Sequence, residues 1–271
     1  ETLFRDPYSI YARHILGLKP LDDIDLQLNV ADFGSALHKA VELFCTKHPD
    51  SIPPNAETEL FEIGEKAIAE LNFSITAAAF WKPRVFEALK WFLARQRERI
   101  ASIRRIYPEQ SGQAVLPMKG GDFTLTGRAD RIDVLKDGSI SIIDYKTGTL
   151  PTEKSVLAGY SPQLPLEAEI IRRHGFANLP QGEVKTLEYW RLRGESDGGK
   201  TLKISADADE LTAAALERLT AAIEAFDNPE TPYLPTPDTS VSQKYNDYDH
   251  LARFDEWATR EETEDGDDGD D

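Results

Sequence analysis

Cysteine and methionine are almost absent from this chain of 271 residues, which contains one of each, Cys45 and Met118. A single cysteine excludes an internal disulfide, a zinc site built from four cysteines and an iron–sulfur cluster held by four cysteines. Long apolar runs are missing too: no stretch approaches the roughly 20 apolar residues of a membrane-spanning helix, and no signal-peptide core opens the chain. We therefore expect a cytoplasmic protein without a membrane partner.

Positive charge is also scarce, with 31 Lys and Arg against 48 Asp and Glu and a formal net charge of −17. A net negative charge of this size argues against a nucleic-acid partner. The charge is unevenly distributed, however: residues 261–271 contain eight acids and no base, whereas residues 84–105 contain seven bases and two acids. We expect a solvated acidic tail at 259–271 and a basic helix, either an ordinary solvated face or a surface that contacts a phosphate backbone.

Hydrophobic residues make up 40% of the chain, enough for a folded domain with a sizeable core. The spacing of apolar residues changes from helical in the first 107 residues to alternating beyond Pro108. This order predicts one central sheet in an α/β or α+β fold. Helices are expected at 8–16, 32–47, 55–73, 83–106, 152–174, 209–226 and 245–258, and strands at 123–134, 139–146 and 185–193.

Two aspartates are expected to meet on a β-hairpin. Asp130 and Asp144 are each seven residues from Asp137, which lies in the Gly-containing turn 136–138 between two predicted strands. In an antiparallel hairpin centred on Asp137 the two carboxylates lie directly opposite each other, with Cβ atoms about 5 Å apart. The alternation of side chains also places Lys146 on the same face as Asp144.

Two carboxylates at this separation repel each other unless a cation or a proton lies between them. Oxygen ligands of this kind suit Mg²⁺ or Mn²⁺, and a lysine beside the metal would orient water or stabilise charge on a phosphate. The alternative is an ordinary salt bridge between Asp130 and Lys146 on the hairpin surface.

The run Gly127-x-x-Asp130, followed by Asp144-Tyr-Lys146-Thr-Gly148 and later by Gln163, resembles the PD-(D/E)XK nuclease superfamily in its RecB-like branch. Segments 6–13, 33–38 and 248–253 extend the resemblance to the C-terminal nuclease domains of AddB-type proteins. The resemblance implies an α/β fold with a central mixed β-sheet flanked by α-helices. It also implies a domain at 1–258, with a helical portion at 1–107 and a nuclease core at 112–258.

The resemblance implies a role for each matching residue. His38, Asp130, Asp144 and the carbonyl of Tyr145 would bind Mg²⁺, which Mn²⁺ could replace, and Lys146 would be the catalytic lysine beside the two aspartates. Gln163 and Tyr145 would contribute to DNA binding, and the basic helix offers Arg95 and Arg99 for the same role. The sequence departs from the family at Glu167, where a tyrosine is expected. Because the cysteines of the family's iron–sulfur cluster are missing, no cluster is expected.

The resemblance implies a metal-dependent deoxyribonuclease that cuts single-stranded DNA during double-strand break repair, beside an AddA-like helicase–nuclease subunit. Two alternatives stay open. The chain could be a catalytically silent nuclease-fold module that binds DNA or acts as a scaffold in the same complex. It could also be a stand-alone nuclease without a helicase partner, although the chain begins at Glu1 rather than at a methionine.

Overall fold

The computed structural model describes residues 1–19, 30–71, 75–194, 199–235, 237 and 247–253. The chain divides into two compact units. The larger unit comprises residues 26–218, and the smaller unit combines residues 1–25 with residues 219–271.

The larger unit is built on a five-stranded sheet with the order β1-β2-β3-β4-β5. The strands are β1 (Ile103–Leu116), β2 (Phe123–Leu135), β3 (Ile140–Lys146), β4 (Val184–Leu192) and β5 (Gly199–Lys203). β3 and β4 pair in parallel, whereas the other three neighbouring pairs are antiparallel. The prediction of a central mixed sheet is confirmed.

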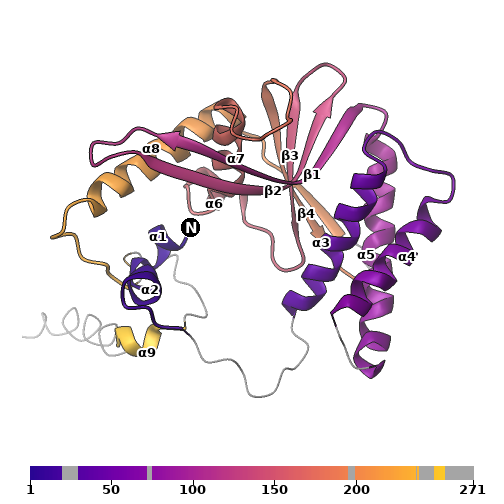
Figure 1. The fold of residues 1–271 in the computed structure, drawn as a ribbon, viewed down its shortest axis with the longest axis horizontal. Helices are drawn as coiled ribbons and strands as arrows, with labels where there is room; N and C mark the ends of the chain where they lie inside the picture. Colours follow the sequence, from indigo (N-terminus) through magenta and orange to yellow (C-terminus); the bar gives the residue numbers. More distant parts are fainter. Residues whose placement is uncertain (20–29, 72–74, 195–198, 236, 238–246, 254–271) are drawn as a thin grey trace, which may run out of the picture. The chain divides into compact units, whose positions relative to one another are not determined.

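A helical layer lies on one face of the sheet: α3 (Val30–Lys47) and α5 (Ile75–Arg99) contact the strands, and α4 (Ala56–Glu70) packs against both helices (Figure 1). Their apolar side chains pack against Ile143, Tyr145 and Trp190. The opposite face carries Ile132 and Ile142 and packs against α7 (Gln163–Arg172) and the start of α8 (Ala208–Phe226). A short helix, α6 (Glu153–Leu157), precedes α7 in the crossover between β3 and β4. The central strand β3 is therefore buried on both faces, as expected of a strand in a parallel pair.

The basic segment differs from its prediction. α5 begins at Ile75 and ends at Arg99 rather than spanning 83–106, and the chain then enters β1, which was not predicted as a strand. Ser102 ends the helix, because its amide and its hydroxyl both donate to the Arg99 carbonyl. Beyond it the amide of Ile106 donates to the Pro49 carbonyl, and β1 pairs with β2 along most of its length.

The smaller unit contains the short helices α1 (Thr2–Arg5) and α2 (Pro7–Ile10), a π-helical turn η1 (Tyr11–Ile15) and α9 (Asp249–Ala252). α9 lies within the predicted helix 245–258, but residues 245–246 and 254–258 and the acidic tail 259–271 lie outside the described residues. Tyr248 anchors α9 by donating a hydrogen bond from its hydroxyl to the Leu18 carbonyl at 3.0 Å. Within the described ranges, no helix combines the length and the apolar character of a membrane span.

Candidate metal centre and active site

The β2–β3 hairpin has the register that the sequence predicts. Its cross-strand partners, from Val134↔Ile140 to Arg131↔Ile143, are all equidistant from Asp137. One step further, the Asp130 carboxylate accepts a hydrogen bond from the Tyr145 amide at 2.8 Å. Asp130 and Asp144 therefore both lie where the pairing of β2 with β3 ends. At this point the Tyr145 amide donates to the side chain of Asp130 and not to a backbone carbonyl of β2.

Asp144 is 2% exposed and is held by two donors. Its Oδ1 accepts hydrogen bonds from Gln163 Nε2 at 2.7 Å and from Lys146 Nζ at 2.9 Å. Its Oδ2 is buried and, although 2.9 Å from Lys146 Nζ, makes no hydrogen bond within the described part of the chain. Burial raises the pKa of Asp144 to about 6 against the opposing charge of Lys146, and the Asp130 carboxylate raises it further.

His38 approaches this end of the hairpin from α3. Its Nε2 lies 3.1 Å from the Tyr145 carbonyl, and its Nδ1 lies 3.6 Å from Asp130 Oδ1 and 4.0 Å from Glu109 Oε1. Burial lowers the pKa of the imidazole, but the nearby carboxylates, Asp130 foremost, outweigh it and raise the pKa. α3 comes close to the sheet because Gly34 has no side chain, since a Cβ there would lie 3.1 Å from Thr147 Oγ1.

Glu109 joins the cluster from β1, and the sequence did not mark it. It lies between two cross-strand pairs, Pro108↔Arg131 and Gln110↔Ala129, and therefore faces Asp130 across the ladder. Ligand atoms of His38, Glu109 and Asp130 all lie within 4.8 Å of one another. These three residues line a cavity of about 450 Å³.

Lys146 and Gln163 complete the cluster. Lys146 Nζ donates to the Asp144 carboxylate and, at 3.1 Å, to Gln163 Oε1. Gln163, the first residue of α7, thus contacts both the aspartate and the lysine of the hairpin. The structure therefore brings together His38, Asp130, Asp144, the backbone of Tyr145, Lys146 and Gln163, all of which the sequence singled out.

A family model described as the PD-(D/E)XK nuclease superfamily matches residues 1–242. The chain belongs to the PD-(D/E)XK nuclease superfamily. Membership implies nuclease activity and the use of a divalent metal, and the mixed sheet flanked by helices agrees with the fold of this superfamily.

Two curated proteins are similar to part of this chain. An uncharacterized protein of Rickettsia bellii (strain RML369-C) is 34% identical over 176 residues, which is 65% of this chain and 21% of that protein. An ATP-dependent helicase/deoxyribonuclease subunit of Clostridium acetobutylicum is 30% identical over 191 residues, 61% of this chain and 16% of that protein. The chain thus spans about a fifth of the length of the curated relatives it matches.

A solved structure described as "Crystal structure of SSO0001" is 11% identical and has a TM-score of 0.30, covering 79% of this chain and 85% of that chain. The superfamily assignment rests on the family model and not on this remote similarity.

The cluster has the donors that a divalent cation requires. Carboxylates, a backbone carbonyl and an imidazole are suitable ligands for Mg²⁺ or Mn²⁺. The buried Asp144 Oδ2 accepts no hydrogen bond among the described residues, so it keeps an open acceptor position beside the Lys146 ammonium group, which lies 2.9 Å away. The residues present therefore fit a divalent metal.

Glu167, where the family pattern has tyrosine, lies behind Gln163 and is 4% exposed. Its Oε1 accepts a hydrogen bond from Gln163 Nε2 at 3.1 Å, and its buried Oε2 makes no hydrogen bond with any described residue. Burial raises the pKa of Glu167 to about 8, despite the opposing hydrogen bond from Gln163. Glu167 therefore supports Gln163 and is protonated at neutral pH.

Glu167→Gln should change how stability depends on pH. The pKa of Glu167 in the folded protein lies above its unfolded value, so its ionisation opposes folding as pH rises from about 4.3 through about 8. The variant should be as stable as the parent near pH 5 and should become more stable, by a few kcal/mol at most, near pH 9. Urea denaturation at both pH values, with EDTA present, measures this difference. Equal pH dependence in the two proteins would contradict the burial of an ionisable group at this position.

Arg99 and Arg95 lie outside the cluster. Arg99 Nη1 donates to Glu188 Oε1 at 2.9 Å, its Nη2 lies 3.4 Å from Asp133 Oδ2, and the side chain is 23% exposed. Arg95 pairs with Glu98 at 2.7 Å on the exposed side of α5. Arg99 thus ties α5 to the sheet, and a DNA contact by either arginine stays a prediction.

The Tyr145 ring is also turned away from the cluster. It is 3% exposed, packs among the apolar side chains beneath α3 and α5, and has its hydroxyl 3.4 Å from Arg131 Nη1. Only the backbone of Tyr145 reaches His38 and Asp130. We therefore do not assign DNA binding to its side chain.

Proposed function

We propose that this chain is the nuclease domain of an AddB-like helicase–nuclease subunit and that it hydrolyses phosphodiester bonds of single-stranded DNA with Mg²⁺. The observation that carries the proposal is the convergence of Asp130, Asp144 and Lys146 at the end of one hairpin, where the Tyr145 amide holds Asp130 and the Lys146 ammonium group holds Asp144. The similarity to the helicase/deoxyribonuclease subunit of Clostridium acetobutylicum supports the assignment to a larger subunit. We propose an AddA-like partner, a cytoplasmic location and a role in double-strand break repair on the same basis.

The proposed metal ligands are His38, Asp130, Asp144 and the carbonyl of Tyr145, joined by Glu109. Ligand atoms of His38, Glu109 and Asp130 lie within 4.8 Å of one another, and Asp144 lies outside that group. A bound Mg²⁺ would polarise a phosphate oxygen and lower the pKa of a coordinated water. The Tyr145 amide orients Asp130, and Gln163 orients Asp144, so both carboxylates are preorganised.

Lys146 acts beside the carboxylates. Two of its three N–H bonds are directed to Asp144 and Gln163. The third remains to orient the attacking water and to stabilise the negative charge that develops on the phosphate. Because Gln163 also donates a hydrogen bond to Asp144, it fixes the positions of the lysine and the carboxylate relative to each other.

A direct assay tests the proposal. The 271-residue chain should cleave a labelled single-stranded oligonucleotide when Mg²⁺ or Mn²⁺ is added and should be inactive in EDTA, because the carboxylates need a divalent cation to approach a phosphate. Cleavage should be faster on single strands than on a blunt duplex of the same sequence. No metal-dependent cleavage of either substrate, at any ratio of enzyme to DNA, would contradict the proposal.

The alternative is a catalytically silent nuclease-fold module that binds DNA or acts as a scaffold. The complete set of residues disfavours it, because a module that had lost catalysis would not need to keep the contact of His38 with Asp130 or those among Asp144, Lys146 and Gln163. Titration with Mn²⁺ separates the two: a nuclease should have a site that is lost in Asp144→Ala, and a silent module should have none.

A further inference from the structure

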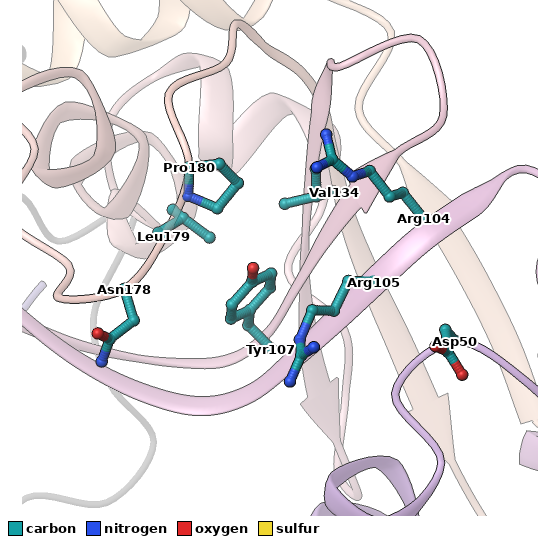
Figure 2. Close-up of a pocket in the computed structure, with 8 residues that line it drawn as sticks. All are labelled: Asp50, Arg104, Arg105, Tyr107, Val134, Asn178, Leu179 and Pro180. Carbon is teal, nitrogen blue, oxygen red and sulfur yellow. The ribbon is translucent and has the colours of Figure 1, made fainter.

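A second cavity lies along β1, and none of its lining residues is a proposed metal ligand. It has a volume of about 520 Å³, within the usual range for small-molecule sites. It is lined by β1, by Val134 of β2, by the turn after α3 and by the loop that precedes β4 (Figure 2). Its lining residues are Asp50, Arg104, Arg105, Tyr107, Val134, Asn178, Leu179 and Pro180.

Two consecutive arginines give this cavity its charge. Arg104 and Arg105 are both exposed, and neither guanidinium forms an ion pair or a hydrogen bond with any residue that the structure describes. Other bases differ in this respect: Lys82, Lys90 and Arg95 of α5 each pair with a glutamate. An unpaired pair of guanidinium groups is suited to bind a phosphate.

The cavity also offers an aromatic ring and an apolar wall. Tyr107 lies at the centre of the cavity, with Leu179 and Pro180 on one side and Arg105 on the other (Figure 2). The Arg105 guanidinium lies 5.6 Å from the centre of the Tyr107 ring. Cationic groups beside an aromatic ring are the combination by which proteins bind single-stranded nucleic acid, with the phosphate on the cation and the base on the ring.

The walls of the cavity are held in place. The amide of Ile106, between Arg105 and Tyr107, donates to the Pro49 carbonyl and thereby positions the turn that carries Asp50. On the opposite side, Gln113 of β1 donates to the Gly175 carbonyl and so anchors the loop that leads to Asn178. The cavity is therefore formed by backbone contacts and not by the accidental placement of surface side chains.

Its place on β1 relates it to the metal centre. Tyr107 precedes Glu109 by two residues and Arg105 precedes it by four, so they are displaced by about 7 and 13 Å along the strand at roughly 3.3 Å per residue. We propose that this cavity binds a nucleotide unit of the single strand whose scissile phosphate lies at Asp130 and Asp144. The proposal rests on the proposed function, and it defines a path for the substrate along the edge strand.

Binding of a fluorescent oligothymidylate in EDTA tests the cavity without cleavage. Arg104→Gln/Arg105→Gln should weaken binding about tenfold and lower the slope of log K against log salt by about 1.4, or about 0.7 for each lost phosphate contact. Asp50→Asn should tighten binding about two- to threefold, because it removes the acidic group of the cavity. A gain in affinity cannot arise from unfolding, so this variant keeps the test decisive.

The matched control is Arg97→Gln/Lys203→Gln, which removes two exposed positive charges that likewise have no ion pair among the described residues. It should change the affinity less than twofold, and an equal loss in both double variants would overturn the proposal. Displacement of the oligomer by thymidine monophosphate at the same concentration would also overturn the proposal, since the cavity would then be a site for free nucleotides.

Hydrolysis of bis(p-nitrophenyl) phosphate, which is too small to reach the cavity, should be unchanged in Arg104→Gln/Arg105→Gln. If no form hydrolyses this ester, the proposed function fails while the binding result still decides the cavity.

Discussion

Lys146→Ala should lower the rate of Mg²⁺-dependent cleavage of single-stranded DNA by about 10²- to 10³-fold, the usual effect of removing one donor that stabilises developing charge. Lys146 is the cation in direct contact with Asp144 and Gln163, and no other lysine contacts either residue in the described part of the chain. Initial rates at saturating Mg²⁺ measure the effect. Lys154→Ala, on the exposed face of α6, is the matched control and should retain the parent rate.

The same variant separates catalysis from metal binding. Lys146 is not among the proposed ligands, so Lys146→Ala should keep the Mn²⁺ site in a calorimetric titration, whereas Asp144→Ala should lose it. The Lys146 charge also lowers the pKa of Asp144, and its removal should shift that carboxyl group's titration above pH 6. Cleavage by Lys146→Ala at the parent rate would remove the lysine from the mechanism.

Asp133→Ala should lower the free energy of unfolding by about 3–5 kcal/mol, because it leaves a buried guanidinium without its counter-charge. Arg131 and Asp133 are both fully buried on the α5 face of the sheet, with Nε–Oδ1 and Nη2–Oδ2 distances of 2.6 and 2.9 Å. Arg99 reaches the same aspartate from α5 at 3.4 Å. Loss of the carboxylate therefore breaks contacts within β2 and between the sheet and the helix layer. Urea denaturation measures the change.

Two further variants show whether the lower stability of Asp133→Ala comes from the unpaired charge or from packing. Asp122→Ala, at an exposed position before β2, should change the free energy of unfolding by less than about 0.5 kcal/mol. Replacing the pair together, as Arg131→Met/Asp133→Leu, should cost less than Asp133→Ala alone, because no buried charge is then left unpaired. If the double variant were the less stable protein, the penalty would come from packing and not from charge.

The placement of Asp130, Asp144 and Lys146 at one end of the sheet could be predicted because these residues belong to one hairpin. Positions equidistant from a turn must face each other in an antiparallel pair, so the symmetry of Asp130 and Asp144 about Asp137 predicted their meeting. The alternation of side chains likewise placed Lys146 on the face of Asp144. The prediction that His38 and Gln163 belong to the same site came from the resemblance to a family, because no local sequence pattern connects α3 or α7 to the end of β3.

Glu109 could not be predicted because the segment that carries it was assigned to no strand. Ile103 and Ile106, spaced three apart, fit the end of a helix as well as the start of a strand, and only the pairing with β2 decides between them. Once that register exists, Glu109 must face Asp130. The role of Arg99 could not be predicted for a similar reason. In the sequence it is one of several bases on a helix, whereas its partners Asp133 and Glu188 lie in β2 and β4.

The amino-acid sequence by itself predicted the hairpin and placed two aspartates and a lysine at its end, because these follow from alternation and turn position along one stretch of chain. The superfamily came from the resemblance of its motifs to known nucleases. The tertiary structure decided which charges serve the site. Strand pairing brought Glu109 to His38 and Asp130, helix packing bound Arg99 to the sheet, and the edge strand left Arg104 and Arg105 without an ion pair among the described residues, beside a cavity. Net charge is a sum over the chain, but the energy of each charge depends on its distance from others and on its burial, which only the fold sets.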